Sequence, residues 1–106
     1  MKRFFLAACW LFASINVAKA DDSLDVADRL GEIIGAEDAC GLTLDQAAIN
    51  RYVSNHVAAD DLDFVGYLKT STWTAKEDLS EMGATERSAH CMQVVRSAKA
   101  IGVTTE

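Results

Sequence analysis

The stretch DVADRLGEIIGAEDACG, residues 25–41, decides the fold that we predict for this chain. Its large apolar side chains recur at the spacing that places them on one face of an α-helix, and they are Val26, Leu30, Ile33 and Ile34. The helix can continue to Cys40, after which Gly41 suits the left-handed conformation that ends a helix. Gly31 and Gly35 each weaken a helix by about 1 kcal/mol relative to alanine, so they indicate either close packing or an interruption.

Three further segments show the same spacing, and none of the 106 residues is a proline that would break a helix. The residues expected to begin these helices are the capping box at 43–46, the N-caps Asp60 and Asp61, and the N-cap Thr85. The residues expected to end them are Val57, Gly83 and Gly102, and residues 103–106 should fray. The prediction is an all-α chain: a compact bundle of about four helices in a single domain, residues 21–106.

The middle of the third predicted helix is unusual. Residues 70–74 combine β-branched and hydroxyl side chains, which lowers helix propensity and favours a kink or fraying there. Trp73 lies about a quarter turn away from the apolar stripe of this helix. A half-exposed tryptophan is suited to anchoring a partner, so Trp73 is a candidate interface residue. The alternative is that Trp73 covers the edge of a small core.

Residues 1–20 have the three parts of a secretory signal peptide. A basic start at Lys2 and Arg3 precedes an apolar stretch, residues 4–17, and a small-x-small exit at residues 18–20. We therefore expect cleavage before Asp21 and export of the remaining chain. A lipoprotein site at Cys9 fits less well, because too few apolar residues precede it.

Two cysteines remain after cleavage, Cys40 and Cys91. An even pair in an exported protein predicts a disulfide, which here would join the end of the first helix to the fourth. A zinc site that recruits His56 and His90 would need short paired ligand spacing, which the chain lacks. We therefore predict no metal.

Removing residues 1–20 takes away three basic side chains and no acid, which leaves 16 acidic and 7 basic side chains and a net charge of −9. Nucleic acid and anionic lipid both require a basic surface, so neither is an expected partner, and no membrane contact is expected after cleavage. The acidic surface serves solubility or steers a basic partner. Since the chain shows no nucleophile–base pair, phosphate-binding glycine loop or haem-attachment motif, we predict neither an enzyme nor a cofactor.

Four short runs carry a resemblance to a known family: residues 39–42, 45–49, 56–61 and 89–91. They resemble a family of small exported proteins of alphaproteobacteria, whose members are often labelled "signal recognition particle". An acidic, exported chain does not suit that label. The resemblance implies a pair of cysteines and a Gram-negative periplasm, and it implies no functional residue.

Two functions are consistent with these features. The first is a non-catalytic binding or regulatory module that presents an acidic face, with Trp73 as a contact, to another envelope protein. The second is an acid-stress chaperone, because protonation of 16 carboxylates and two histidines would change the charge from −9 to +9 and loosen the fold. The general build is similar to that of small periplasmic acid-stress chaperones.

Overall fold

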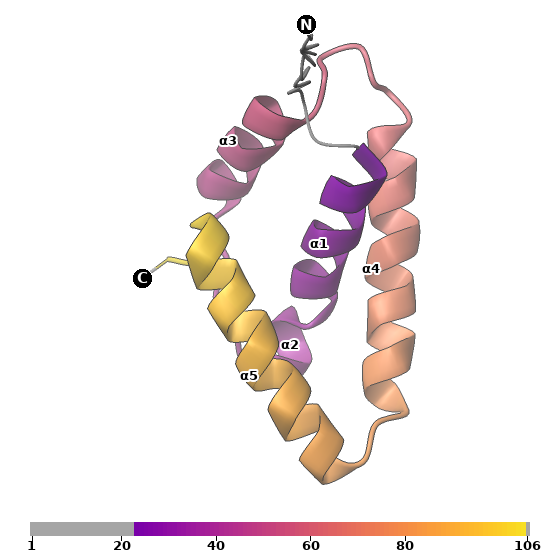
Figure 1. The fold of residues 1–106 in the computed structure, drawn as a ribbon, viewed down its shortest axis with the longest axis vertical. Coiled ribbons are helices and arrows are strands. Elements are labelled where there is room, and N and C mark those ends of the chain that lie inside the picture. Colours follow the sequence, from indigo (N-terminus) through magenta and orange to yellow (C-terminus); the bar gives the residue numbers. More distant parts are fainter. Residues whose placement is uncertain (1–22, 106) are drawn as a thin grey trace, which may run out of the picture.

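The computed structural model describes residues 23–105, which contain five helices and no strand beyond one isolated bridge (Figure 1). This confirms the all-α prediction. The helices are α1 (Ser23–Gly35), α2 (Glu37–Cys40), α3 (Gln46–His56), α4 (Phe64–Ser80) and α5 (Ala84–Ile101). There are five helices, where about four were expected, because the first predicted helix is divided into α1 and α2. The predicted signal peptide, residues 1–20, lies outside the described residues.

The division falls at Ala36. Its amide donates to the carbonyl of Ile33 at 3.2 Å, an i to i−3 turn that interrupts the α-helical pattern before α2 begins. At the end of α2, Gly41 adopts the left-handed conformation with φ 69°, and the amide of Leu42 donates to the carbonyl of Glu37 at 2.9 Å. The predicted stop at Gly41 is therefore confirmed.

α1 lies in the centre of the molecule, and each of the other four helices contacts it (Figure 1). Four of its side chains are at most 1% exposed, and they are Val26, Ala27, Leu30 and Ile33. Burial of a large aliphatic side chain stabilises a fold by roughly 1.5–3 kcal/mol. The stripe quoted from residues 25–41 therefore forms the centre of the core.

α1 and α4 run side by side in the same direction, since Gly31 lies against Ser71 and Gly35 against Ala75. A Cβ atom on Gly31 would lie 2.5 Å from the Ser71 Cβ and 2.9 Å from backbone atoms of residues 71 and 72. On Gly35 it would lie 2.7 Å from the Ala75 Cβ. Both glycines thus permit close packing of two helices, one of the two roles that the sequence left open.

The predicted kink at residues 70–74 is wrong, because α4 continues without a break from Phe64 to Ser80. Small side chains are needed where α4 meets the two glycines of α1. The Ser71 hydroxyl also donates to the Asp28 carboxylate at 2.8 Å, which links the two helices. Tertiary packing here outweighs low intrinsic propensity.

α3 and α5 lie on the other side of α1 from α4, with the C-terminal end of α5 near the start of α3 (Figure 1). The expected fraying of residues 103–106 is wrong for residues 103–105, which the structure describes. Val103 is fully buried, and its carbonyl accepts a hydrogen bond from the Asp45 amide at 2.8 Å. The Thr105 amide donates to the Thr43 carbonyl at 3.1 Å, and Thr104 forms the isolated bridge with Leu44. The last residues therefore join α5 to α3.

We expect Val103→Ala to lower the free energy of unfolding by about 2 kcal/mol, because it deletes two methyl groups from a fully buried site. Urea denaturation followed by circular dichroism measures this loss. Val65→Ala is the matched control, since Val65 is 68% exposed and should change stability by less than about 0.5 kcal/mol. Equal stability of the two variants would contradict the burial of Val103 in the core.

Three predicted helix starts are also corrected. α3 is capped by Asp45, whose carboxylate accepts from the amides of Ala47 at 3.0 Å and Ala48 at 3.2 Å. Thr43 is not the cap, because residues 43 and 44 form hydrogen bonds with the C-terminal residues.

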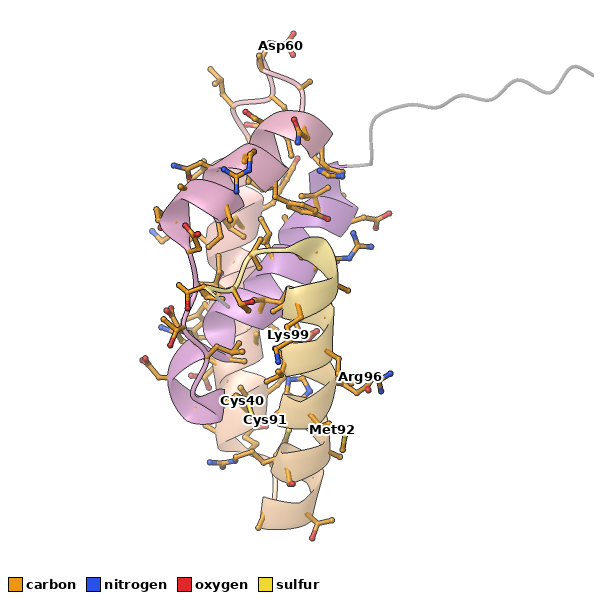
Figure 2. The ribbon with its side chains drawn as sticks, turned by 90° about the vertical axis from the view of Figure 1, so that its left-hand side faces the viewer. Cys40, Asp60, Cys91, Met92, Arg96 and Lys99 are labelled. Atoms are coloured by element: carbon orange, nitrogen blue, oxygen red, sulfur yellow. A yellow bond between two sulfur atoms is a disulfide. The ribbon has the colours of Figure 1, made fainter. Side chains whose placement is uncertain are left out.

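The predicted starts of the last two helices are also wrong. Asp60 and Asp61 lie in the loop before α4, and Figure 2 shows Asp60 at one end of the molecule. The residues that directly precede the last two helices are Asp63 for α4 and Gly83, in place of Thr85, for α5.

Candidate functional site

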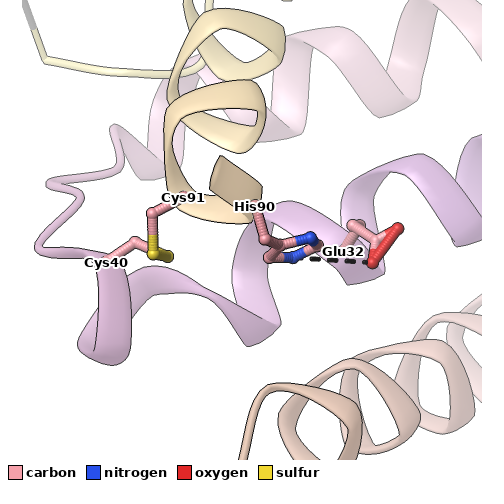
Figure 3. The surroundings of a disulfide bond; sticks show 4 residues. All are labelled: Glu32, Cys40, His90 and Cys91. Carbon is pink, nitrogen blue, oxygen red and sulfur yellow. Dashed lines mark ion pairs between the residues drawn. A yellow bond between two sulfur atoms is a disulfide. The ribbon is translucent and has the colours of Figure 1, made fainter. Parts of the chain in front are cut away.

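The predicted disulfide is present, and it joins Cys40 at the end of α2 to Cys91 in α5 (Figures 2 and 3). The two Cα atoms are 5.3 Å apart. Beside it, the His90 Nε2 atom lies 3.9 Å from a carboxylate oxygen of Glu32 on α1, an ion pair only when the imidazole is protonated (Figure 3). Both contacts connect α5 to the α1–α2 segment.

The disulfide lies in the N-terminal half of α5, which contains no buried residue. The buried residues of this helix are Val94 and Ala98, and both follow Cys91 in the chain. Before Cys91, the side chain of Arg87 donates to the Met82 carbonyl at 3.3 Å, a contact with the preceding turn. The disulfide therefore links the first half of α5 covalently to the rest of the fold.

Trp73, the candidate interface residue, is 63% exposed on α4. Most of the surface of this residue is therefore accessible to solvent. Met92 on α5 is similarly exposed, at 59%, and Figure 2 shows it pointing away from the molecule. No partner is present in the structure, so an interface at Trp73 stays a prediction.

The two histidines occupy separate places. His56 ends α3, where its ring stacks on Tyr52 with 4.1 Å between ring centroids and its Nδ1 atom lies 2.8 Å from the Tyr52 carbonyl. A carbonyl can only accept, so Nδ1 carries the hydrogen. His56 thus packs its ring on Tyr52 and binds the carbonyl of the same residue. His90 lies beside the disulfide instead, and the structure does not bring the two histidines together with the cysteines.

The structure shows a feature that the sequence did not reveal: a groove of about 790 Å³ between α3 and α4. α1 and α2 contribute Ile34 and Glu37 to its lining, and the loop before α4 contributes Asp61. The large apolar side chains that line it are Leu44, Ile49, Val53, Val57, Leu62, Phe64, Val65 and Leu68. Leu62 is 85% exposed and Val65 is 68% exposed, so the groove leaves apolar surface in contact with water.

This groove could have been anticipated only in part. The apolar residues of α3 and α4 were assigned to a core face by their spacing, as in any amphipathic helix. Leu62 and Val65 extend that apolar set beyond what α1 can cover. The signal was therefore an excess of apolar residues at positions 62–68, which spacing alone does not distinguish from core.

The residues of the described part, 23–105, include no group of three or more histidine, cysteine or acidic side chains placed to hold a metal ion. Among the same residues, no helix is both long enough and apolar enough to cross a membrane. Comparisons with family models, with curated proteins and with solved structures found no significant match.

Proposed function

We propose that this protein is a non-catalytic binding module that holds an amphipathic helix of an envelope protein in the groove between α3 and α4. The observation that carries the proposal is the set of exposed apolar side chains in a concave surface. Exposed apolar patches with polar rims mark sites of protein interaction. Burying a large aliphatic side chain such as Leu62 or Val65 under a partner contributes roughly 1.5–3 kcal/mol before the cost of association.

The charges around the groove indicate the chemistry of the partner. The charged residues among its lining are Glu37 and Asp61, both acidic. Asp60 and Asp63 flank Asp61 in the same loop. A helix with apolar anchors at i, i+4 and i+7 and with lysine or arginine beside them matches both the apolar lining and the acidic rim.

The site of action follows from the first 20 residues. Their signal-peptide pattern and the disulfide together support export to the periplasm, where oxidising conditions preserve such a bond. Isolation of the protein from the periplasm of its own cells, followed by mass spectrometry, tests this. A chain that begins at Asp21 supports export, whereas a chain that retains residues 1–20 contradicts it.

The binding proposal predicts that an amphipathic helical peptide of leucine and lysine binds at least about tenfold more tightly than the same peptide with glutamate in place of lysine. Replacing Leu62 and Val65 together with serine should weaken the lysine peptide by about tenfold or more, because apolar contact is lost without any change of charge. Fluorescence anisotropy of the labelled peptide measures both effects.

Met92→Ser is the matched control, since Met92 is an exposed apolar side chain on α5 outside the groove. It should leave the affinity unchanged. Trp73→Ala tests the interface predicted from the sequence, because Trp73 does not line the groove. Equal weakening by the groove variant and by Met92→Ser would show non-specific attraction and contradict the proposal. Protection of an unfolded client only at low pH would favour the acid-stress chaperone instead.

A further inference from the structure

The single-turn helix α2 takes part in both the disulfide and the groove. Its first residue, Glu37, lines the groove between α3 and α4, and its last residue, Cys40, is bonded to Cys91 of α5. Leu44, four residues after Cys40, also lines the groove. The position of α2 therefore sets part of the groove wall.

α2 has little packing of its own to hold it in place. None of its four residues is buried, and a helix of one turn is not stable in isolation. The chain is fixed on either side, at the fully buried Ala36 and at residues 43–45, which form backbone hydrogen bonds with residues 103–105. Between these points, Cys40 and Leu42 are only half-buried against the core. The disulfide is therefore the covalent anchor of α2 on α5.

The disulfide is accessible from solvent. It lines a pocket of about 570 Å³ together with Ala39, Ala84, Ser88 and Arg87. The first three have small, exposed side chains, and the two cysteines are half-buried. These small side chains leave room for another thiol to approach the sulfur atoms, so the fold does not have to open first.

Arg87 supplies a positive charge in this pocket. It precedes Cys91 by one turn of α5, and the described residues that line the pocket include no carboxylate. Its Nη2 atom donates to the Met82 carbonyl, whereas its buried Nε atom has no hydrogen-bond partner among residues 23–105. A cation beside a cysteine favours the thiolate form. Arg87 therefore favours both the approach of a thiolate and the departure of the Cys91 sulfur from the disulfide.

We propose that this disulfide is a redox switch for the groove. The oxidised protein binds the partner helix, and a dithiol protein that reduces the Cys40–Cys91 bond releases it. The proposal rests on the binding function proposed for the groove. It adds the regulation of that site by the state of two cysteines.

The reaction is a thiol–disulfide exchange in two steps. A thiolate of the dithiol attacks Sγ of Cys40 and forms a new S–S bond, while the old bond breaks with its electron pair on Cys91, which takes up a proton. The second thiolate of the dithiol then attacks its own partner sulfur in the mixed disulfide, and Cys40 leaves and takes up a proton. The protein gains two electrons and two protons, which the dithiol loses as it becomes a disulfide.

Reduction separates α2 from α5 but leaves the contact of α1 with α4 in place, because that contact, at Gly31 and Gly35, involves neither cysteine. The partner helix must then order α2 as it binds, which costs affinity. We expect the peptide of leucine and lysine to bind at least about tenfold more weakly to the reduced protein than to the oxidised protein.

Fluorescence anisotropy of the labelled peptide compares the oxidised protein, the protein reduced with dithiothreitol, and the double variant Cys40→Ser with Cys91→Ser. The double variant should bind as weakly as the reduced protein and should not respond to dithiothreitol. ¹H–¹⁵N NMR of the reduced protein should retain the signals of Gly31, Gly35 and Ala75, which distinguishes weaker binding from unfolding.

Equal affinity of the oxidised and reduced proteins would overturn the switch and leave the groove proposal standing. Loss of the α1 and α4 signals on reduction would also overturn the switch, because the disulfide would then only maintain the fold. Absence of binding to the oxidised protein would instead overturn the binding function, and the switch with it.

Thermodynamic linkage provides a second test. If reduction weakens peptide binding by about tenfold, saturating peptide shifts the thiol–disulfide equilibrium with dithiothreitol toward the protein disulfide by the same factor. Replacing Leu62 and Val65 together with serine should abolish this shift, whereas Met92→Ser should retain it. An equilibrium that the peptide leaves unchanged, while the oxidised protein binds it, would overturn the switch.

Discussion

Removal of the disulfide by Cys40→Ala with Cys91→Ala should lower the free energy of unfolding by about 4 kcal/mol. The bond closes a loop between residues 51 apart in sequence, and its loss restores conformational entropy to the unfolded chain. A folded region as small as residues 23–105 buries a modest fraction of its surface, so about 4 kcal/mol is a large share of its stability. Urea denaturation followed by circular dichroism measures the change.

Reduction of the native protein with dithiothreitol should give a similar loss, whereas the double variant should not respond to dithiothreitol at all. The loss should also be uneven along the chain. Hydrogen exchange should increase most in residues 84–93 of α5, because its buried residues, Val94 and Ala98, lie after Cys91. An unchanged unfolding midpoint, with both thiols shown to be free by alkylation, would contradict a stabilising role.

Gly31→Val should be the second most damaging change, with a loss of about 3 kcal/mol in the free energy of unfolding. The new Cβ alone would lie 2.5 Å from the Ser71 Cβ and 2.9 Å from backbone atoms of residues 71 and 72. Backbone cannot rotate out of the way as a side chain can, so α4 would have to move away from α1. The small gain in helix propensity of valine over glycine does not compensate for that movement.

Gly66→Val is the matched control for this prediction. Gly66 lies inside α4, and a Cβ atom there would meet nothing within 4 Å. The same substitution should therefore leave stability unchanged within about 0.5 kcal/mol. Thermal and urea unfolding of both variants measure the difference, and equal stability would contradict the close approach of α1 and α4.

The sequence alone predicts the disulfide, but it does not reveal the role of Gly31. The pair Cys40 and Cys91 could be predicted from parity and from the predicted signal peptide, because no other cysteine follows residue 20. The role of Gly31 could not, since glycine in a helix is consistent with a break as well as with close packing. Only the position of Ser71 opposite Gly31 distinguishes these roles, and 40 residues separate the two in the chain.

The candidate sites show the same contrast. Trp73 was noticed because it lies off the apolar stripe of its own helix, and its 63% exposure agrees with that position. The groove between α3 and α4 was not predicted. The groove collects side chains from several helices, and spacing within one helix does not show which faces of different helices meet.

The sequence by itself determined the all-α fold class, the left-handed stop at Gly41 and the cysteine pair. Each depends on residues close together in the chain, or on the count of one residue type. The tertiary structure alone decided the parallel contact of α1 with α4, the burial of Val103 and the groove between α3 and α4. These depend on contacts between distant residues, because packing against another helix decides whether a glycine, a hydroxyl or a chain end is buried.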